Sequence, residues 1–339
     1  MQLDHTHVVI RLRKFTEIGD LSLFMIRRYP EALLVGFGTG AIGWAITNMI
    51  LLGWIPWEES LYGLDDEAAF GEVSRYIIWM TLLVILQTPA AGVFATLYLG
   101  QAVFEKRPTW KYVGSEVKRQ FKRWFWVLGV RRLAVPTMIL LAVRWGQPAS
   151  GFWDIFIPVT ILLWATVVRA NRPFAPEILL LEQCPLRGSS ESVITMAKRS
   201  KALHGPMSGE LTGRFASISL ILGGIVLSCF YTLIWFRGIT LGYWNFMNLT
   251  VLLVFFPLAL WLVAGVSVII RLLNYLDTRI RLEGWEVELS VRAESLRQFG
   301  SEDSVDSSPR SQSSKSTPLK TADPANLKAK RIQASGVNR

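Results

Sequence analysis

The sequence predicts an all-α polytopic membrane protein with six transmembrane helices, amphipathic interfacial helices and a disordered C-terminal tail. Composition supports this class, because 51% of the 339 residues are hydrophobic and only 18% are charged, against about 25% charged in average soluble domains. The mean hydropathy of +0.34 is also high for a soluble chain. In addition, several apolar runs approach the ~20 residues that a helix needs to cross the hydrocarbon core of a bilayer.

Residues 1–31 are predicted to form a cytoplasmic, interfacial segment. Apolar residues recur at helical spacing between Thr16 and Tyr29, basic residues close the last turn, and Pro30 ends the helix. A basic amphipathic helix next to a span usually lies in the plane of the lipid headgroups. No apolar core with a small-residue cleavage site is found here, so we expect the first span to act as its own insertion signal.

The six-span transmembrane domain is predicted over residues 32–270. Its spans are expected at about 32–54, 76–104, 124–145, 152–168, 216–236 and 246–270. The third is the least regular, because its apolar run begins only at Leu133 and is too short to cross a bilayer. Extending it backwards brings Arg131 and Arg132 into the membrane. Two interpretations stay open: the arginines snorkel to the headgroups, or they form a pocket for an anion or a lipid headgroup.

Glycines in the first span predict close helix packing. The run Gly36-Phe-Gly-Thr-Gly40 resembles a dinucleotide-binding loop, but no strand precedes it and apolar sequence continues on both sides. Gly36 and Gly40 instead form a small-xxx-small pair, which lets a second helix approach closely within a membrane. We therefore predict that Gly36 and Gly40 are helix-packing residues rather than cofactor ligands.

The segments that flank the last two spans are predicted to be helical at the membrane surface. Between spans 4 and 5, two surface helices are expected at about 176–182 and 190–203, and a C-terminal amphipathic helix is expected at 271–299. In the C-terminal helix Asp277 and Arg281, and likewise Arg279 and Glu283, are four residues apart and are predicted to form weak exposed pairs on a partner-binding surface. Residues 300–339 are rich in Ser, Pro and Lys, which predicts a disordered cytoplasmic tail.

The distribution of basic residues predicts that both termini face the cytoplasm. All but three of the 36 lysines and arginines fall in the N-terminal segment, the second and fourth loops, or the C-terminal region, as the positive-inside rule requires. The exceptions, Arg75, Arg144 and Arg237, are expected at outer ends of spans, where Asp154 is predicted to pair with Arg144. The net charge of +10 therefore indicates a multi-pass protein of the inner membrane and no nucleic-acid partner.

Three segments together resemble a bacterial membrane-domain family. They are Thr16-Glu-Ile-Gly-Asp-Leu with Arg27-Arg-Tyr-Pro30, Ala197-Lys-Arg-Ser-Lys-Ala-Leu203 with Gly205 and Gly213-Arg214, and Tyr275-Leu-Asp-Thr-Arg-Ile-Arg-Leu-Glu-Gly284. The family is the six-span membrane domain that precedes the catalytic domain in some glycerophosphodiester phosphodiesterases and also occurs alone. The resemblance implies a helical domain with interfacial helices. It carries over no catalytic residue, because the chain lacks the ~250 residues of the TIM-barrel catalytic domain.

Two functions follow from this organisation. The first is a non-enzymatic scaffold or accessory subunit, because no catalytic pattern such as His-Glu-x-x-His or Gly-x-Ser-x-Gly is present. The alternative is a transporter or lipid-handling protein that uses Arg131 and Arg132 near the inner leaflet, with prolines breaking the spans. Cys184 and Cys229 are expected at different levels, so neither a disulfide nor a metal or cofactor is predicted. The expected partners are anionic lipid at the cytoplasmic face and a membrane protein or a second copy of the chain.

Overall fold

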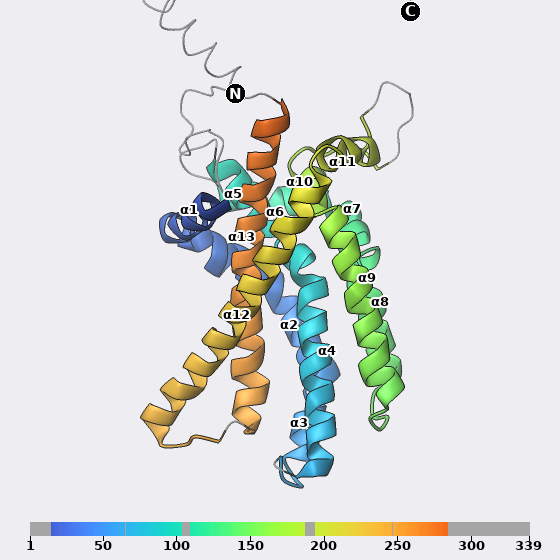
Figure 1. Ribbon diagram of the computed structural model, residues 1–339, viewed down its shortest axis with the longest axis vertical. Helices are drawn as coiled ribbons and strands as arrows, with labels where there is room; N and C mark the ends of the chain where they lie inside the picture. The colour runs from blue at the N-terminus through green and yellow to red at the C-terminus, as the bar shows by residue number, and fades with distance from the viewer. Residues whose placement is uncertain (1–14, 65, 104–108, 187–193, 246, 284–339) are drawn as a thin grey trace, which may run out of the picture. The chain divides into compact units, whose positions relative to one another are not determined.

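The computed structural model describes residues 15–64, 66–103, 109–186, 194–245 and 247–283, and every regular element in these ranges is a helix (Figure 1). In the first half of the chain the helices are α1 Phe15–Arg28, η2 Ala32–Phe37, α2 Gly38–Leu52, α3 Trp54–Glu59, α4 Glu67–Ala91, α5 Val93–Ala102, α6 Trp110–Arg119, α7 Phe121–Trp124 and η3 Phe125–Val130. In the second half they are α8 Ala134–Val143, η4 Phe152–Phe156, α9 Ile157–Asn171, α10 Ala175–Leu180, α11 Met196–His204, α12 Ser208–Leu241, η5 Val251–Phe255 and α13 Phe256–Glu283. The four η elements are short π-helical segments. The predictions for residues 1–14 and 284–339 lie outside the described residues.

Five helical segments of the described chain are long and apolar enough to cross a membrane. They are Ala32–Leu52, Ala69–Ala91, Phe152–Asn171, Ser208–Leu241 and Val251–Glu283. A sixth crossing is formed if Phe121–Val130 and Ala134–Val143 are one span, although these two helices are bent by 62° relative to each other. The all-α, multi-pass class predicted from the sequence is therefore confirmed.

The second span is shorter than predicted. The bounds 76–104 predicted for this span differ from those of the structure, because α4 ends at Ala91 and α5 begins after Gly92. Pro89 lies inside the last turn of α4, and a proline has no N–H to bond the carbonyl four residues earlier, which weakens the helix at that point. The short helix α5 is almost entirely buried and packs against η2, α6, α10 and α13.

The third span is broken at the two arginines that made it irregular in the sequence. The helix η3 ends at Val130, a turn covers Arg131 to Leu133, and α8 begins at Ala134. Leu133 has a φ of +67°, in the left-handed region that costs a branched residue energy. The apolar run that begins at Leu133 therefore forms a separate short helix, α8, on the far side of the break.

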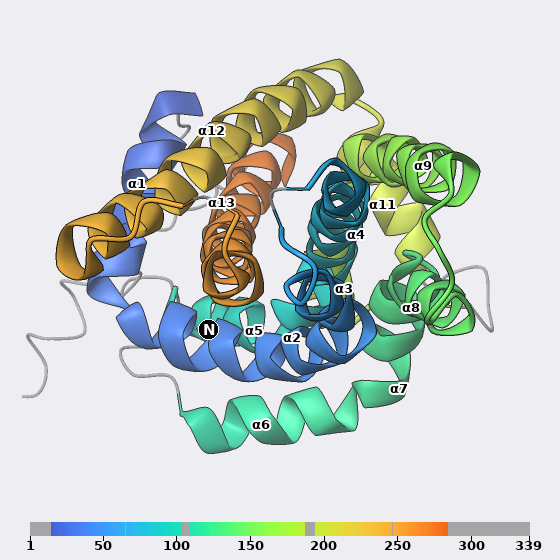
Figure 2. The ribbon, with the colours of Figure 1, turned by 90° about the horizontal axis from the view of Figure 1, so that it is seen from below.

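The helix α13 is the element against which most others pack. It contacts α1, α4, α5, α12 and η2, and Figure 2 shows it surrounded by α12, α2 and α4. It runs without interruption from Phe256 to Glu283, so the boundary expected between residues 270 and 271 falls inside one helix. In Figure 1, α10 and α11 lie at the upper end of this bundle and α3 lies at the lower end. We call these the α11 end and the α3 end.

One short helix is more buried than the sequence suggested. The surface helix predicted at 176–182 is α10, and every residue of α10 is buried. Its side chains Ile178, Leu179 and Leu180 belong to a hydrophobic cluster that also contains residues of α1, α5 and α13. The prediction of a surface location was therefore wrong, because a run that is too short to span the membrane was covered by elements distant in the sequence.

Gly36 and Gly40 lie where the first span approaches α4 and α5 most closely. A Cβ atom at Gly40 would lie 2.0 Å from the carbonyl oxygen of Ala91, which is far inside van der Waals contact. A Cβ atom at Gly36 would lie 3.2 Å from the Cα of Ala95. Only glycine permits the observed backbone separation at position 40.

An ion network joins three helices near the α3 end. Asp154 accepts a bond from the indole nitrogen of Trp79 at 3.0 Å and pairs with the guanidinium group of Arg75 at 3.1 Å. The predicted pair with Arg144 is present at 3.5 Å, but Arg75 is the closer partner and is only 3% exposed. This network holds the start of α9 against α4.

Candidate functional site

A pocket of about 750 Å³ lies between α4, α9, α12 and α13. This volume lies in the range of about 300–1,000 Å³ that is typical of small-molecule sites. Most of its surface is aliphatic or aromatic, with Phe256 and Leu260 of α13 on one wall and Leu222 and Leu227 of α12 on another. The exposed side chains of Leu162 and Leu227 show that it is open to the surroundings of the bundle.

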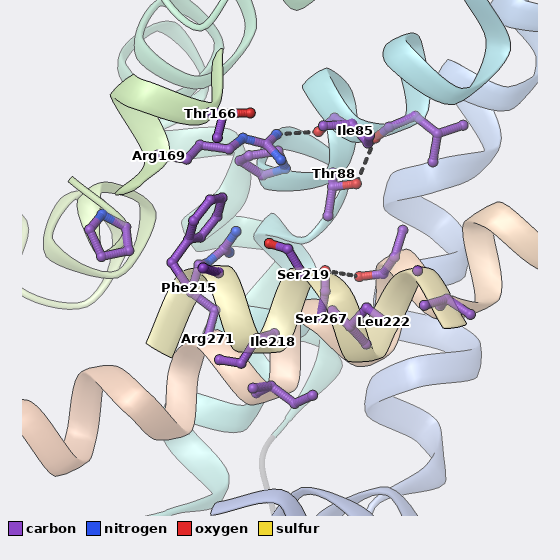
Figure 3. Close-up of a pocket in the computed structure, with 18 of the residues that line it drawn as sticks. Ile85, Thr88, Thr166, Arg169, Phe215, Ile218, Ser219, Leu222, Ser267 and Arg271 are labelled. Atoms are coloured by element: carbon purple, nitrogen blue, oxygen red, sulfur yellow. Dashed lines mark hydrogen bonds between the residues drawn. The ribbon is translucent and has the colours of Figure 1, made fainter. Parts of the chain in front are cut away.

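Four arginines line this pocket, and all belong to its α11 end. They are Arg132 in the break before α8, Arg169 in the last turn of α9, Arg214 in α12 and Arg271 in α13. Figure 3 shows Arg169 and Arg271 on different walls, with Phe215 and Ser219 of α12 between these walls. The pocket is therefore amphipathic, with cations at one end and hydrocarbon along the rest.

Arg169 is held by a carbonyl that a proline has released. Pro89 has no N–H to bond the carbonyl oxygen of Ile85, and the Nη2 atom of Arg169 donates to that oxygen instead (Figure 3). The same proline that shortens α4 therefore fixes a guanidinium group of α9 in the pocket. Among the described residues Arg169 forms no salt bridge with a carboxylate.

Arg271 and Arg132 reach the same region from other elements. The Nε atom of Arg271 donates to Glu177 at 2.6 Å, and that carboxylate is fully buried. The Nη2 atom of Arg271 is buried without a hydrogen-bond partner in the described structure. Arg132 donates to the carbonyl oxygen of Arg172 at 2.9 Å, and both Arg132 and Arg169 lie close enough to Arg271 for electrostatic interaction.

The charges of these arginines are not balanced by the chain. Among the residues that the structure describes, Glu177 pairs with Arg271 and interacts electrostatically with Arg132, whereas Arg169 interacts only with the other two arginines. Uncompensated charge in apolar surroundings is costly, and proteins normally pair it. We call Arg132, Arg169, Arg271 and Glu177 the arginine cluster, and it has an excess of two positive charges.

The fourth arginine is neutralised within the chain. Arg214 pairs with Asp277 at 3.0 Å and with Glu210 at 2.6 Å. Asp277 also pairs with Arg281 at 2.9 Å. Two cations therefore face two carboxylates, and this group adds no net charge to the pocket.

The rest of the pocket presents few free polar groups. The hydroxyls of Thr88, Thr166 and Ser267 each donate to a carbonyl of their own helix, at 2.6, 2.8 and 2.6 Å. Hydroxyls that are bonded in this way behave as part of the helix surface. The pocket below the arginine cluster is therefore suited to a hydrocarbon chain and poorly suited to a charged group.

The two arginines singled out by the sequence differ in position. Arg132 lines the pocket, whereas Arg131 is exposed and is not part of its wall. The sequence did not single out Arg169, Arg271 or Glu177, which were assigned to loops or helix ends. Pro89 could have indicated such a residue, because a proline inside a span leaves the carbonyl four residues earlier without its helical donor, and a donor from another helix is then needed.

The residues proposed as a partner surface are engaged with other parts of the chain. Asp277 is 2% exposed and pairs with Arg214 of α12, so its pair with Arg281 is not the exposed contact expected. Glu283 pairs with Arg279, as predicted, and also with Arg199 of α11. These contacts join α13 to α11 and α12.

A second group of charges fixes α11 to α13. Glu182, between α10 and α11, accepts bonds from Arg199 at 2.5 Å and from the hydroxyl of Tyr275 at 2.6 Å. Burial opposes ionisation of Glu182, but these bonds outweigh burial and lower the pKa of its carboxyl group. At the end of α11, burial lowers the pKa of His204, whose Nδ1 bonds the carbonyl oxygen of Ser200 at 2.6 Å. Both groups hold the wall of the pocket that contains Phe174.

Comparison with known proteins adds no relative. No family model matches the chain, and neither a curated protein nor a solved structure is significantly similar to it. The resemblance to the six-span membrane domain of the phosphodiesterases therefore stays a prediction.

Proposed function

We propose that this protein is a lipid-handling membrane protein that binds an anionic lipid in the pocket between α4, α9, α12 and α13. The observation that carries the proposal is the arrangement of the arginine cluster at one end of an apolar pocket of about 750 Å³. An anionic amphiphile matches both parts, with its headgroup at the cluster and a hydrocarbon chain along α12 and α13. Charge-assisted bonds from arginine to phosphate are among the strongest polar contacts in proteins.

The same arrangement favours binding over transfer of the headgroup across the membrane. A path for a headgroup needs polar groups along its length, and the hydroxyls of Thr88, Thr166 and Ser267 are bonded to their own helices. The headgroup is then held at the α11 end while the chain occupies the apolar part. A lipid-handling function was the alternative predicted from the sequence, where both Arg131 and Arg132 were expected to bind the lipid. In the present proposal only Arg132 of these two does so.

We also propose that the α11 end faces the cytoplasm of a bacterial cell and that the protein lies in the inner membrane. The distribution of basic residues supports this orientation, and the resemblance to a bacterial membrane domain supports the compartment. The lipid would then be taken from the inner leaflet. The scaffold or accessory-subunit function stays a prediction, and it makes no use of the arginine cluster.

Lipid binding by two neighbouring arginine variants tests the proposal. The full chain is purified in mild detergent and titrated with dioleoyl phosphatidylglycerol or dioleoyl phosphatidylcholine, and bound lipid is counted by native mass spectrometry. Arg132→Gln is expected to weaken phosphatidylglycerol binding about tenfold or more, because a bond to a charged group contributes about 1.5–3 kcal/mol. Arg131→Gln removes the same charge one residue away, outside the pocket, and is expected to bind as the wild type does.

Equal losses in both variants would contradict the proposal, because they would indicate attraction to a basic surface rather than a site. Arg132→Lys provides a control for folding, since it keeps the charge and a donor. If Arg132→Gln unfolds at a lower temperature than Arg132→Lys, the comparison is made with Arg132→Lys and Arg131→Lys instead. A flexible ammonium group cannot reproduce the fork of donors of a guanidinium, so binding is still expected to weaken only at position 132.

A further inference from the structure

We propose that the lipid in this pocket carries a phosphomonoester, as phosphatidic acid does, rather than a phosphodiester or a carboxylate. The inference rests on the lipid-binding function proposed above and specifies its ligand class. Two properties of the arginine cluster lead to it: the size of its uncompensated charge, and the number of walls from which its donors come.

The charge of the arginine cluster matches a terminal phosphate. Among the described residues, the carboxylate of Glu177 pairs with Arg271 and interacts with Arg132, while Arg169 interacts with these two arginines and with no carboxylate. Three positive charges and one negative charge leave an excess of two positive charges. A phosphomonoester carries about −1.5 to −2 at neutral pH, so it neutralises this excess. A phosphodiester or a fatty acid carries only about one negative charge and leaves part of the excess uncompensated in an apolar pocket.

Of the ionisable groups near the cluster, Arg172 is exposed, and the others do not change this balance. Arg214 and Arg281 are matched by Glu210 and Asp277 through contacts of 2.6 to 3.6 Å. His204 lies behind Phe174, and its Nε2 accepts the backbone N–H of Phe174 at 3.3 Å. Burial lowers the pKa of His204, so it adds no charge at neutral pH.

The donors of the cluster come from three elements, which suits an anion with three free oxygens. Arg132 is in the break before α8, Arg169 is in α9, and Arg271 is in α13. Each guanidinium group has five N–H donors, and each of these arginines uses one nitrogen for the carbonyl or carboxylate described above. A terminal phosphate presents three strong acceptor oxygens, one for each arginine, whereas a diester or a carboxylate has two.

A matched pair of lipids tests the inference. The full chain in mild detergent is titrated at pH 7.5 with dioleoyl phosphatidic acid, dioleoyl phosphatidylglycerol and dioleoyl phosphatidylcholine, which have the same acyl chains. We expect phosphatidic acid to bind at least tenfold more tightly than phosphatidylglycerol. Arg132→Gln is expected to reduce this ratio to near one, and Arg131→Gln is expected to leave it unchanged.

The outcomes separate this inference from the proposed function. Equal binding of the two anionic lipids, both above phosphatidylcholine, would overturn the phosphomonoester inference and leave anionic-lipid binding intact. Equal binding of all three lipids would overturn both. A preference for phosphatidic acid that is the same in Arg132→Gln and Arg131→Gln would also overturn the inference, because the preference would then arise outside the arginine cluster.

Discussion

Replacement of Arg169 by methionine is expected to be costlier for the fold when residue 89 is proline than when it is alanine. Arg169 bonds the carbonyl oxygen of Ile85, which lacks a helical donor only because residue 89 is proline. Methionine is apolar and fills part of the space of the arginine side chain, but it has no donor, so the carbonyl is left without a partner. Alanine at position 89 restores the N–H that can bond the same oxygen within α4.

The size of the effect follows from the kind of bond. A hydrogen bond to a charged group contributes about 1.5–3 kcal/mol in soluble proteins, whereas side-chain bonds between transmembrane helices reach about 1.7 kcal/mol at most. Arg169→Met also relieves the repulsion from Arg132 and Arg271, and this gain is common to both backgrounds. We therefore expect the free energy of unfolding to change by about 1 kcal/mol less favourably in the natural background than in the Pro89→Ala background, which is a coupling energy of about 1 kcal/mol.

The four proteins of this cycle are compared by unfolding in mixed detergent micelles, followed by far-ultraviolet circular dichroism. Pro158→Ala in α9 provides a control, because that proline releases no carbonyl that Arg169 bonds. The cost of Arg169→Met should be unchanged in the control background. Equal costs in the Pro89→Ala and natural backgrounds would refute the reasoning, since Arg169 would then be held by something other than the released carbonyl.

Three further predictions concern stability. Gly40→Ala is expected to lower the free energy of unfolding by about 1–3 kcal/mol, because its Cβ would lie 2.0 Å from a carbonyl oxygen of α4. Gly43→Ala meets no atom within 4 Å and is expected to stabilise the helix by about 0.5–1 kcal/mol. Equal effects of the two variants in thermal unfolding would contradict the packing at Gly40. Asp154→Asn is expected to cost about 1.5–3 kcal/mol, because the buried guanidinium of Arg75 loses one carboxylate partner and keeps Glu72 at 3.1 Å, and an unchanged unfolding midpoint would argue against the network. Because the pKa of His204 is lowered in the folded state, the unfolded state binds more protons below pH 6.5, so stability should fall as pH drops through that region. His204→Asn should lose this dependence of stability on pH. A dependence that persists in the variant would assign it to another group.

The membrane class, the approximate positions of most spans and the irregularity of the third span followed from local sequence. Hydropathy identifies a span because every backbone polar group must be bonded within the bilayer, and the short run after Leu133 signalled the irregularity that the structure places at Arg131 to Leu133. The sequence could not tell which arginine faces the pocket. That depends on how the turn from Arg131 to Leu133 packs in the fold, where Arg132 reaches the carbonyl oxygen of Arg172.

The rest of the site depends on contacts between residues that are far apart in the chain. Glu177 and Arg271 are 94 positions apart, and Arg169 and Ile85 are 84 positions apart. Hydropathy gives the depth of a residue along a helix but not the direction in which its side chain points, so Arg169 and Arg271 were expected only as cations at the ends of spans. The burial of α10 has the same origin, because α5 and α7 cover it.

The most direct test of the account is to find where a bound anionic lipid lies. A phosphatidic acid with a photoreactive diazirine in its acyl chain is incorporated into nanodiscs with the full chain and activated, and the labelled peptides are identified by mass spectrometry. The account predicts labels on pocket residues such as Leu222 and Leu260, competed by unlabelled phosphatidic acid and reduced in Arg132→Gln. Labels confined to the exposed residues Leu220 and Ile221 on α12, without competition, would contradict a lipid site in this pocket.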